Sequence, residues 1–134
     1  MITICKKFKF DAAHHLPDYQ GKCHNIHGHT FHMEVEVSGK VQEEGSETGM
    51  IIDFSNLKTI VNETVIDLVD HTDLNNQFRN PTAENMVERF ANSIQEELNR
   101  HYYVPLHLDD SNIFLKRLRL YETEDSYAEW RRDY

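Results

Sequence analysis

Several features that would direct the chain to other classes of protein are missing from its 134 residues. Its two cysteines, Cys5 and Cys23, are too few for a framework of disulfide bonds. No apolar run approaches the roughly 20 residues of a membrane span, and residues 1–7 hold no apolar core of a secretory signal. With only five glycines and three prolines, the chain has no linker, repeat or low-complexity tract rich in these residues. We therefore expect a single cytoplasmic domain over residues 1–134.

Positive charge is also scarce. The chain has 14 Lys and Arg against 23 Asp and Glu, a formal net charge of −9, and no basic cluster longer than Arg131-Arg132. This balance disfavours a nucleic-acid partner, because a phosphate backbone is bound through many cations. The apolar content of 39% is somewhat low for a compact monomer and fits a small subunit of a homo-oligomer.

The period of the apolar residues changes along the chain. Residues 2–13 and 27–38 alternate between apolar and polar, which predicts two strands. Helical spacing follows in two segments, and two more strands are expected at about 113–122 and 127–131. The order strand, strand, helix, helix, strand, strand indicates an α+β domain with both helices on one face of an antiparallel four-stranded sheet.

The apolar faces of the two expected helices can be read from the sequence. The first face consists of Leu57, Ile60, Val61, Val65 and Leu68, and the second of Met86, Val87, Phe90, Ala91, Ile94 and Leu98. Asp53 or Ser55 is the expected N-cap of the first helix, and Asn80 or Thr82 that of the second.

Three histidines make a candidate metal site. His27 and His29 begin the second strand two residues apart, so their side chains point to the same face. His14 continues the face of the first strand that holds Phe10, and antiparallel pairing would bring it beside the other two. Three imidazoles with an open fourth position are typical of a catalytic zinc. The alternative is ordinary surface or core histidines, since a chain with nine of them contains chance pairs.

Cys23 and the pair Asp70-His71 are candidates for proton transfer. Cys23 lies four residues before His27, where a thiol can serve as a ligand, a base or a nucleophile. A carboxylate beside an imidazole can raise its basicity, and the pair would engage a third group such as Cys23. The alternative for Asp70 and His71 is an ordinary helix C-terminus, where a histidine favours the helix dipole.

Glu122 ends a strand face that also carries Phe114, Leu118 and Leu120. An acid at the edge of an apolar face can bind the guanidine-like edge of a flat heterocycle through paired hydrogen bonds. Alternatively, the strand simply emerges into water there.

Six segments, taken in order, resemble the 6-pyruvoyltetrahydropterin synthase/6-carboxytetrahydropterin synthase family. They are FDAAH at 10–14, CHNIHGH at 23–29, GMIIDF at 49–54, LVDHTDLN at 68–75, NPTAE at 80–84 and YET at 121–123. The resemblance covers about residues 8–123. It implies a tunnelling fold (T-fold), a ββααββ unit whose copies assemble through their sheets, often as two stacked trimers with active sites between subunits.

The resemblance also implies roles for individual residues. His14, His27 and His29 match the Zn²⁺ ligands, Cys23, Asp70 and His71 the proton-transfer set, Glu122 the acid that anchors the pterin ring, and Thr82 the segment lining the pterin pocket. The substrate in the family is 7,8-dihydroneopterin triphosphate, for whose phosphates Lys22 is a candidate partner.

The compact chain and its Cys-x-x-x-His-Gly-His motif favour the bacterial branch of the family. That branch forms 6-carboxytetrahydropterin, acetaldehyde and triphosphate on the way to queuosine. One alternative is the 6-pyruvoyltetrahydropterin branch, which eliminates triphosphate without releasing acetaldehyde. Another is a non-catalytic module of the same fold that binds a pterin or purine. A zinc hydrolase of another fold is disfavoured, because the chain has no His-Glu-x-x-His motif.

Overall fold

A computed structural model of the protein describes residues 1–102 and 113–133. In chain order its elements are β1 (Ile2–His14), the 3₁₀ turn η1 (Lys22–His24), β2 (His27–Gly39), α1 (Phe54–Val61), the π-helical turn η2 (Asn62–Ile66), α2 (Asp67–Val69), β3 (Thr72–Asp73), the 3₁₀ turn η3 (Leu74–Asn76), α3 (Ala83–Tyr102), β4 (Phe114–Thr123) and β5 (Ser126–Arg131). The predicted order of the four long strands and the two helical segments is therefore confirmed.

The strands form one sheet in the order β3-β1-β2-β4-β5. The four long strands are antiparallel to their neighbours, as predicted. The sequence did not predict β3, a two-residue strand that pairs in parallel with Ala12 and Ala13 of β1. Two residues are too short to show any period, so the sequence carried no signal for this fifth strand.

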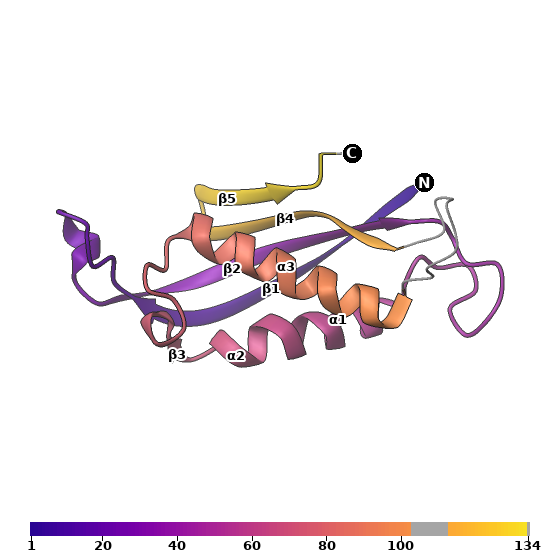
Figure 1. The fold of residues 1–134 in the computed structure, drawn as a ribbon, viewed down its shortest axis with the longest axis horizontal. Helices are drawn as coiled ribbons and strands as arrows, with labels where there is room; N and C mark the ends of the chain where they lie inside the picture. The colour runs from indigo at the N-terminus through magenta and orange to yellow at the C-terminus, as the bar shows by residue number, and fades with distance from the viewer. Residues whose placement is uncertain (103–112, 134) are drawn as a thin grey trace.

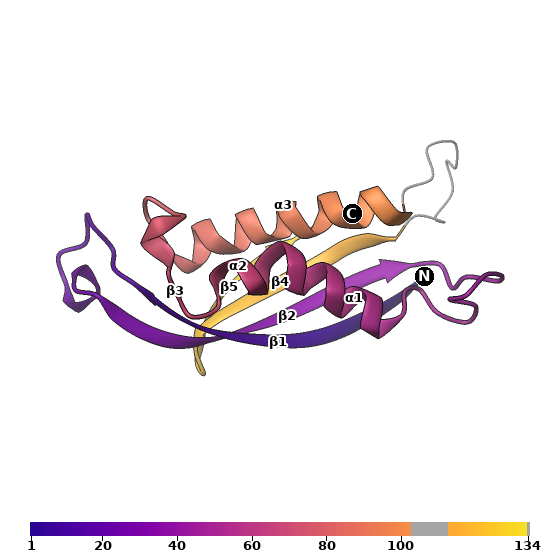
Figure 2. The same ribbon diagram turned by 90° about the horizontal axis from the view of Figure 1, so that it is seen from below.

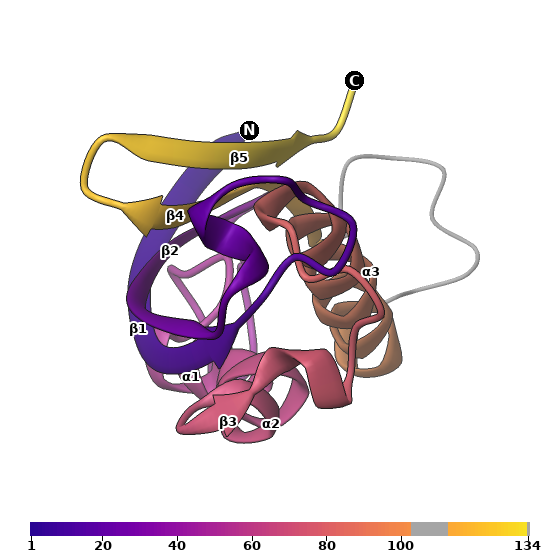
Figure 3. The same ribbon diagram turned by 90° about the vertical axis from the view of Figure 1, so that its left-hand side faces the viewer.

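The helices cover one face of the sheet (Figures 1 and 2). Viewed from its end, the sheet is a curved layer with α1, α2 and α3 on its concave side (Figure 3). The apolar face of each long strand points towards the helices. Phe10 and Phe31 lie opposite each other in β1 and β2, with stacked rings whose centroids are 4.9 Å apart. Within residues 1–102 and 113–133, no helix has both the length and the apolar character needed to cross a membrane.

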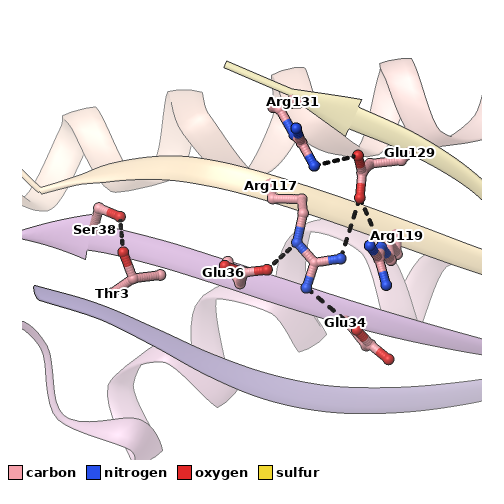
Figure 4. Close-up of polar contacts among 8 residues, drawn as sticks. All are labelled: Thr3, Glu34, Glu36, Ser38, Arg117, Arg119, Glu129 and Arg131. Carbon is pink, nitrogen blue, oxygen red and sulfur yellow. Dashed lines mark hydrogen bonds and ion pairs between the residues drawn. The ribbon is translucent and has the colours of Figure 1, made fainter. Parts of the chain in front are cut away.

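The other face of the sheet is polar and carries a network of ion pairs (Figure 4). Arg117 of β4 pairs with Glu34 and Glu36 of β2, and it also contacts Glu129 of β5. Arg119 donates from Nε to the same oxygen of Glu129 at 2.6 Å. Acidic residues of β2 and β5 thus flank basic residues of β4, so these charges are paired with one another across the strands.

A π-helical turn changes which residues of the first helical segment face the core. Leu57, Ile60, Val61 and Val65 are buried as predicted, but Leu68 is 54% exposed and Val69 is buried in its place. The turn η2 precedes Leu68 and adds a residue to the helical repeat. The prediction of Leu68 in the core was wrong because it assumed an uninterrupted period of 3.6.

A β-bulge changes the face of β4 in a similar way. Val37 of β2 pairs with Leu115, whereas the adjacent Glu36 pairs with Arg117, so Lys116 is an extra residue. Leu115 is therefore fully buried, and Phe114, expected on the core face, is only partly buried. Leu118 and Leu120 lie beyond the bulge and are buried as expected.

The structure selects one N-cap for each helix. The Asp53 carboxylate accepts from the Ser55 backbone N–H at 2.7 Å, which makes Asp53 the cap of α1. The Thr82 hydroxyl accepts from the Asn85 backbone N–H at 3.1 Å and caps α3 in the same way.

Candidate active site

The structure brings together the three histidines that the sequence singled out. His14 lies directly opposite His27 in the ladder of β1 and β2, and His29 lies opposite Ala12. All three side chains share the sheet face that holds Phe10 and Phe31. The ring centroids are 4.6 Å apart for His14 and His27, 5.1 Å for His14 and His29, and 4.8 Å for His27 and His29. The antiparallel register therefore makes the three imidazoles converge.

Backbone carbonyls fix the orientation of two of these rings. Nδ1 of His14 lies 2.9 Å from the carbonyl oxygen of Pro81, and Nδ1 of His27 lies 2.7 Å from that of Asn25. A carbonyl oxygen only accepts, so each Nδ1 carries a proton and each Nε2 of the neutral ring presents a lone pair. This outer hydrogen bond is the usual support of a histidine that binds a metal.

The Nε2 atoms of His14, His27 and His29 are buried without a hydrogen-bond partner. Among the described residues, the only other buried side-chain polar atom in this state is Nδ1 of His15. Native proteins pair nearly all such atoms, and an unpaired one calls for an explanation such as a missing ion. Three neutral imidazole nitrogens are donors that suit a borderline cation such as Zn²⁺. The residues present therefore fit a bound metal.

Glu122 of β4 adds a carboxylate to this cluster. Its Oε1 lies 3.2 Å from Nε2 of His14 and 3.0 Å from Nε2 of His29, although neither contact is a hydrogen bond. One ligand atom from each of the three histidines and Glu122 lies within 4.8 Å of the others. Glu122 also has no partner residue in the ladder of β4 and β5, because the register of the two strands shifts between Tyr121 and Thr123. We define these four residues as the histidine cluster.

Charge and burial compete within the histidine cluster. Contact with His14 lowers the pKa of Glu122 below its ordinary value, although burial opposes this shift. Burial also disfavours the charged form of His14, but Glu122 and the Pro81 carbonyl outweigh it, so the pKa of His14 is raised. At His29 burial dominates over the charge of Glu122, and the pKa is lowered. Glu122 is therefore an ionised carboxylate at neutral pH.

A cavity of about 530 Å³ opens beside Glu122. It lies between the start of α3 and strand β5, and its lining includes Ala83, Tyr127 and Trp130. Thr82, expected to line a ligand pocket, is the residue just before Ala83 and serves as the helix cap. Glu122 thus lies between the three histidines and the cavity.

Asp70 and His71 form a second group with Asp11 of β1. The Asp11 backbone N–H donates to Oδ1 of Asp70 at 2.9 Å, and its carbonyl accepts from the His71 backbone N–H at 2.6 Å. His71 has φ 60°, the only positive value at a non-glycine among the described residues. Its side chain is 78% exposed, with Nε2 3.8 Å from Oδ1 of Asp70. The structure therefore holds His71 in a strained conformation that points its ring outwards.

Cys23 stands apart from both groups. It lies in η1 within the loop between β1 and β2, and its side chain is half-buried. Its backbone carbonyl accepts from the Leu16 N–H at 2.7 Å, which ties this turn to the end of β1. Neither compact group of potential metal ligands in the described part of the chain includes Cys23.

Sequence reasoning missed the residues that hold the site together. Asp11 looked like an ordinary polar residue on a strand, and the carbonyl groups of Asn25 and Pro81 have no sequence signal at all.

Comparison with known proteins identifies the fold and the family of the chain. The five-stranded sheet with its helices on one face resembles the solved structure of Caenorhabditis elegans 6-pyruvoyl tetrahydropterin synthase. The TM-score is 0.75 at 22% identity, over 98% of this chain and 96% of that one. The fold is therefore the T-fold. The model of the 6-pyruvoyl tetrahydropterin synthase family matches residues 3–133, and the chain belongs to this family of pterin synthases.

Curated relatives differ in the reaction that their names state. The chain is 34% identical over 140 residues to the 6-carboxy-5,6,7,8-tetrahydropterin synthase of Haemophilus influenzae, which covers 97% of this chain and 99% of the relative. It is also 34% identical over 119 residues to the dihydroneopterin monophosphate aldolase of Pyrococcus furiosus, which covers 89% of this chain and 88% of the relative.

Proposed function

We propose that the protein is a cytoplasmic, zinc-dependent 6-carboxy-5,6,7,8-tetrahydropterin synthase in queuosine biosynthesis. It would convert 7,8-dihydroneopterin triphosphate to 6-carboxytetrahydropterin, acetaldehyde and triphosphate. Similarity to the Haemophilus influenzae protein over nearly the full length of both chains supports the reaction. The observation that carries the proposal is the convergence of three buried Nε2 atoms without a hydrogen-bond partner, next to Glu122 on the wall of a cavity.

His14, His27 and His29 would hold the Zn²⁺ ion through Nε2. Bound there, Zn²⁺ would supply Lewis acidity that lowers the pKa of the side-chain hydroxyls of the substrate. Glu122 would anchor the pterin ring, since an ionised carboxylate can accept two parallel N–H bonds from the amino-pyrimidinone edge. Its place between the three histidines and the cavity supports this role.

Cys23 would accept a proton at Sγ as a thiolate, and His71 would serve the other end of the transfer with Asp70 beside it. In a single chain Cys23 belongs neither to the histidine cluster nor to the group of Asp11, Asp70 and His71. We propose that the protein is a homo-oligomer, as two stacked trimers, with its active sites between copies. The outward ring of His71 supports a site completed by a second chain. The edge strand β5 and the part of β1 not paired with β3 support assembly through the sheets.

Product analysis tests the proposed reaction. Zinc-loaded protein is incubated with 7,8-dihydroneopterin triphosphate, and acetaldehyde and the pterin product are measured by mass spectrometry. We expect acetaldehyde and 6-carboxytetrahydropterin in equal amounts. 6-Pyruvoyltetrahydropterin without acetaldehyde would assign the chain to the other branch, and cleavage of dihydroneopterin monophosphate instead would indicate the aldolase reaction. No turnover of any of these pterins by folded, zinc-loaded protein would support a binding module.

A further inference from the structure

Asn75 holds the backbone immediately after His14. The backbone N–H of His15 donates to Oδ1 of Asn75 at 2.9 Å, and Nδ2 of Asn75 donates to the carbonyl of His15 at 3.0 Å. This pair of bonds is what a neighbouring strand would give to His15. The Asn75 side chain therefore extends the pairing of β1 beyond its last residue.

Asn75 is itself held in place. Its backbone N–H donates to Oδ1 of Asp73 at 3.0 Å, which caps the turn η3. Asp73 belongs to β3, which pairs with Ala12 and Ala13. The segment 72–75 therefore restrains the β1 backbone on both sides of His14.

His14 is the most buried residue of the histidine cluster, with a side chain 1% exposed. Its ring is held at Nδ1 by Pro81, and its backbone by β2 on one side and by segment 72–75 on the other. The direction of its Nε2 lone pair therefore depends on the backbone at residues 14 and 15. We propose that Asn75 is a positioning residue that sets His14 for binding a metal ion.

This inference rests on the metal site of the proposed function. Outer-shell partners of metal ligands typically contribute 10–100-fold to metal affinity. Asn75 acts through the backbone rather than on the imidazole, so we expect its loss to cost about 10-fold, the lower end of that range.

The test compares Asn75→Ala with Asn76→Ala, a matched change at the adjacent, exposed asparagine of η3. Zn²⁺ and Co²⁺ affinities are measured by competition with a chelator, and the visible spectrum of bound Co²⁺ reports the coordination geometry. We expect Asn75→Ala to bind both ions about 10-fold more weakly and to shift the Co²⁺ bands. Asn76→Ala should match the wild type in both measurements.

A second variant separates positioning from folding. Asn75→Asp keeps the oxygen that accepts from the His15 N–H but loses the donor to the His15 carbonyl. Its second oxygen then faces the His15 carbonyl as one acceptor against another, so Asn75→Asp should also bind both ions more weakly than wild type, and it takes over the test if Asn75→Ala does not fold. Unchanged affinity and Co²⁺ spectrum in the folded Asn75 variants would overturn the role of Asn75 alone. A wild-type protein that binds neither ion would overturn the metal site of the proposed function as well.

Discussion

The histidine cluster and the carboxylate of Glu47 are both buried polar groups, but they differ in how their atoms are paired. Glu47 lies in the loop between β2 and α1 and is 9% exposed. Its Oε1 accepts from the Asp53 backbone N–H at 2.9 Å, from Asn56 at 2.8 Å and from the Tyr102 hydroxyl at 3.1 Å. Three Nε2 atoms of the histidine cluster have no such partner.

This difference separates a structural group from a functional one. The bonds of Glu47 join its loop to the start of α1 and the end of α3, so it stabilises the fold without a ligand. Buried nitrogens without a hydrogen-bond partner cost stability, and a bound cation would satisfy all three at once. Buried polar atoms that the fold leaves unpaired are therefore the more informative sign of a site.

The largest effect is expected from Cys23→Ala. If Cys23 exchanges a proton with the substrate, its loss should lower kcat by about 10²–10⁴-fold, the usual contribution of a general acid or base. Zinc content should stay unchanged, because Cys23 stands outside the histidine cluster. Steady-state kinetics and metal analysis check this, with Cys5→Ala on the polar face of β1 as the control. Full turnover in Cys23→Ala would remove the residue from the mechanism.

His27→Ala should break the histidine cluster directly. We expect Zn²⁺ affinity to fall by more than about 100-fold, beyond the loss of an outer-shell contact, because a ligand itself is removed. Chelator competition measures the affinity. His32→Ala is the matched control, since His32 is an exposed histidine on the opposite face of β2. Equal Zn²⁺ affinity in His27→Ala and wild type would refute the ligand assignment.

Glu47→Ala should affect stability and not metal binding. The change leaves the donors of Asp53, Asn56 and Tyr102 without their acceptor, which should lower the free energy of unfolding by about 2–4 kcal/mol. Urea unfolding of the metal-free protein measures it, with the exposed Glu44→Ala as the control from the same loop. A loss of Zn²⁺ affinity in folded Glu47→Ala would contradict the separation of the two regions.

The smallest effect is a change in the pH dependence of stability. Burial opposes the charge of Glu47, but the hydrogen bonds it accepts outweigh burial and lower its pKa below the ordinary value of 4.5. Folding therefore favours the carboxylate, and its contribution is complete above pH 4.5 and is lost as pH falls through the lowered pKa. Glu47→Gln should unfold with a flatter pH dependence below 4.5 than wild type does. Parallel acid-unfolding curves for the two proteins would contradict this, because they would mean that the pKa of Glu47 is the same in the folded and the unfolded state.

The sequence predicted those parts of the fold that depend on a regular period. Alternation in residues 2–13 and 27–38 predicted both long strands and placed His14 on the face of His27 and His29. It could not show the π-helical turn or the bulge at Lys116, because each inserts one residue, so the residues on its two sides no longer follow one common period. It could not show β3 either, because a strand of two residues is too short to have a period.

The histidine cluster was predictable from spacing, but its supports were not. The partners of His14 and His27 are backbone carbonyls, and any residue type would provide one. The contacts of Asp11 with Asp70 and His71 join positions about 60 residues apart, which no local pattern relates. Only the folded chain shows which buried nitrogens are left unpaired.

The most direct test of the central claim is a crystal structure of the zinc-loaded protein, with anomalous diffraction recorded at the zinc edge. We predict one peak per chain, about 2.0–2.1 Å from Nε2 of His14, His27 and His29. A peak at the group of Asp11, Asp70 and His71, or no peak at the histidine cluster, would contradict the account.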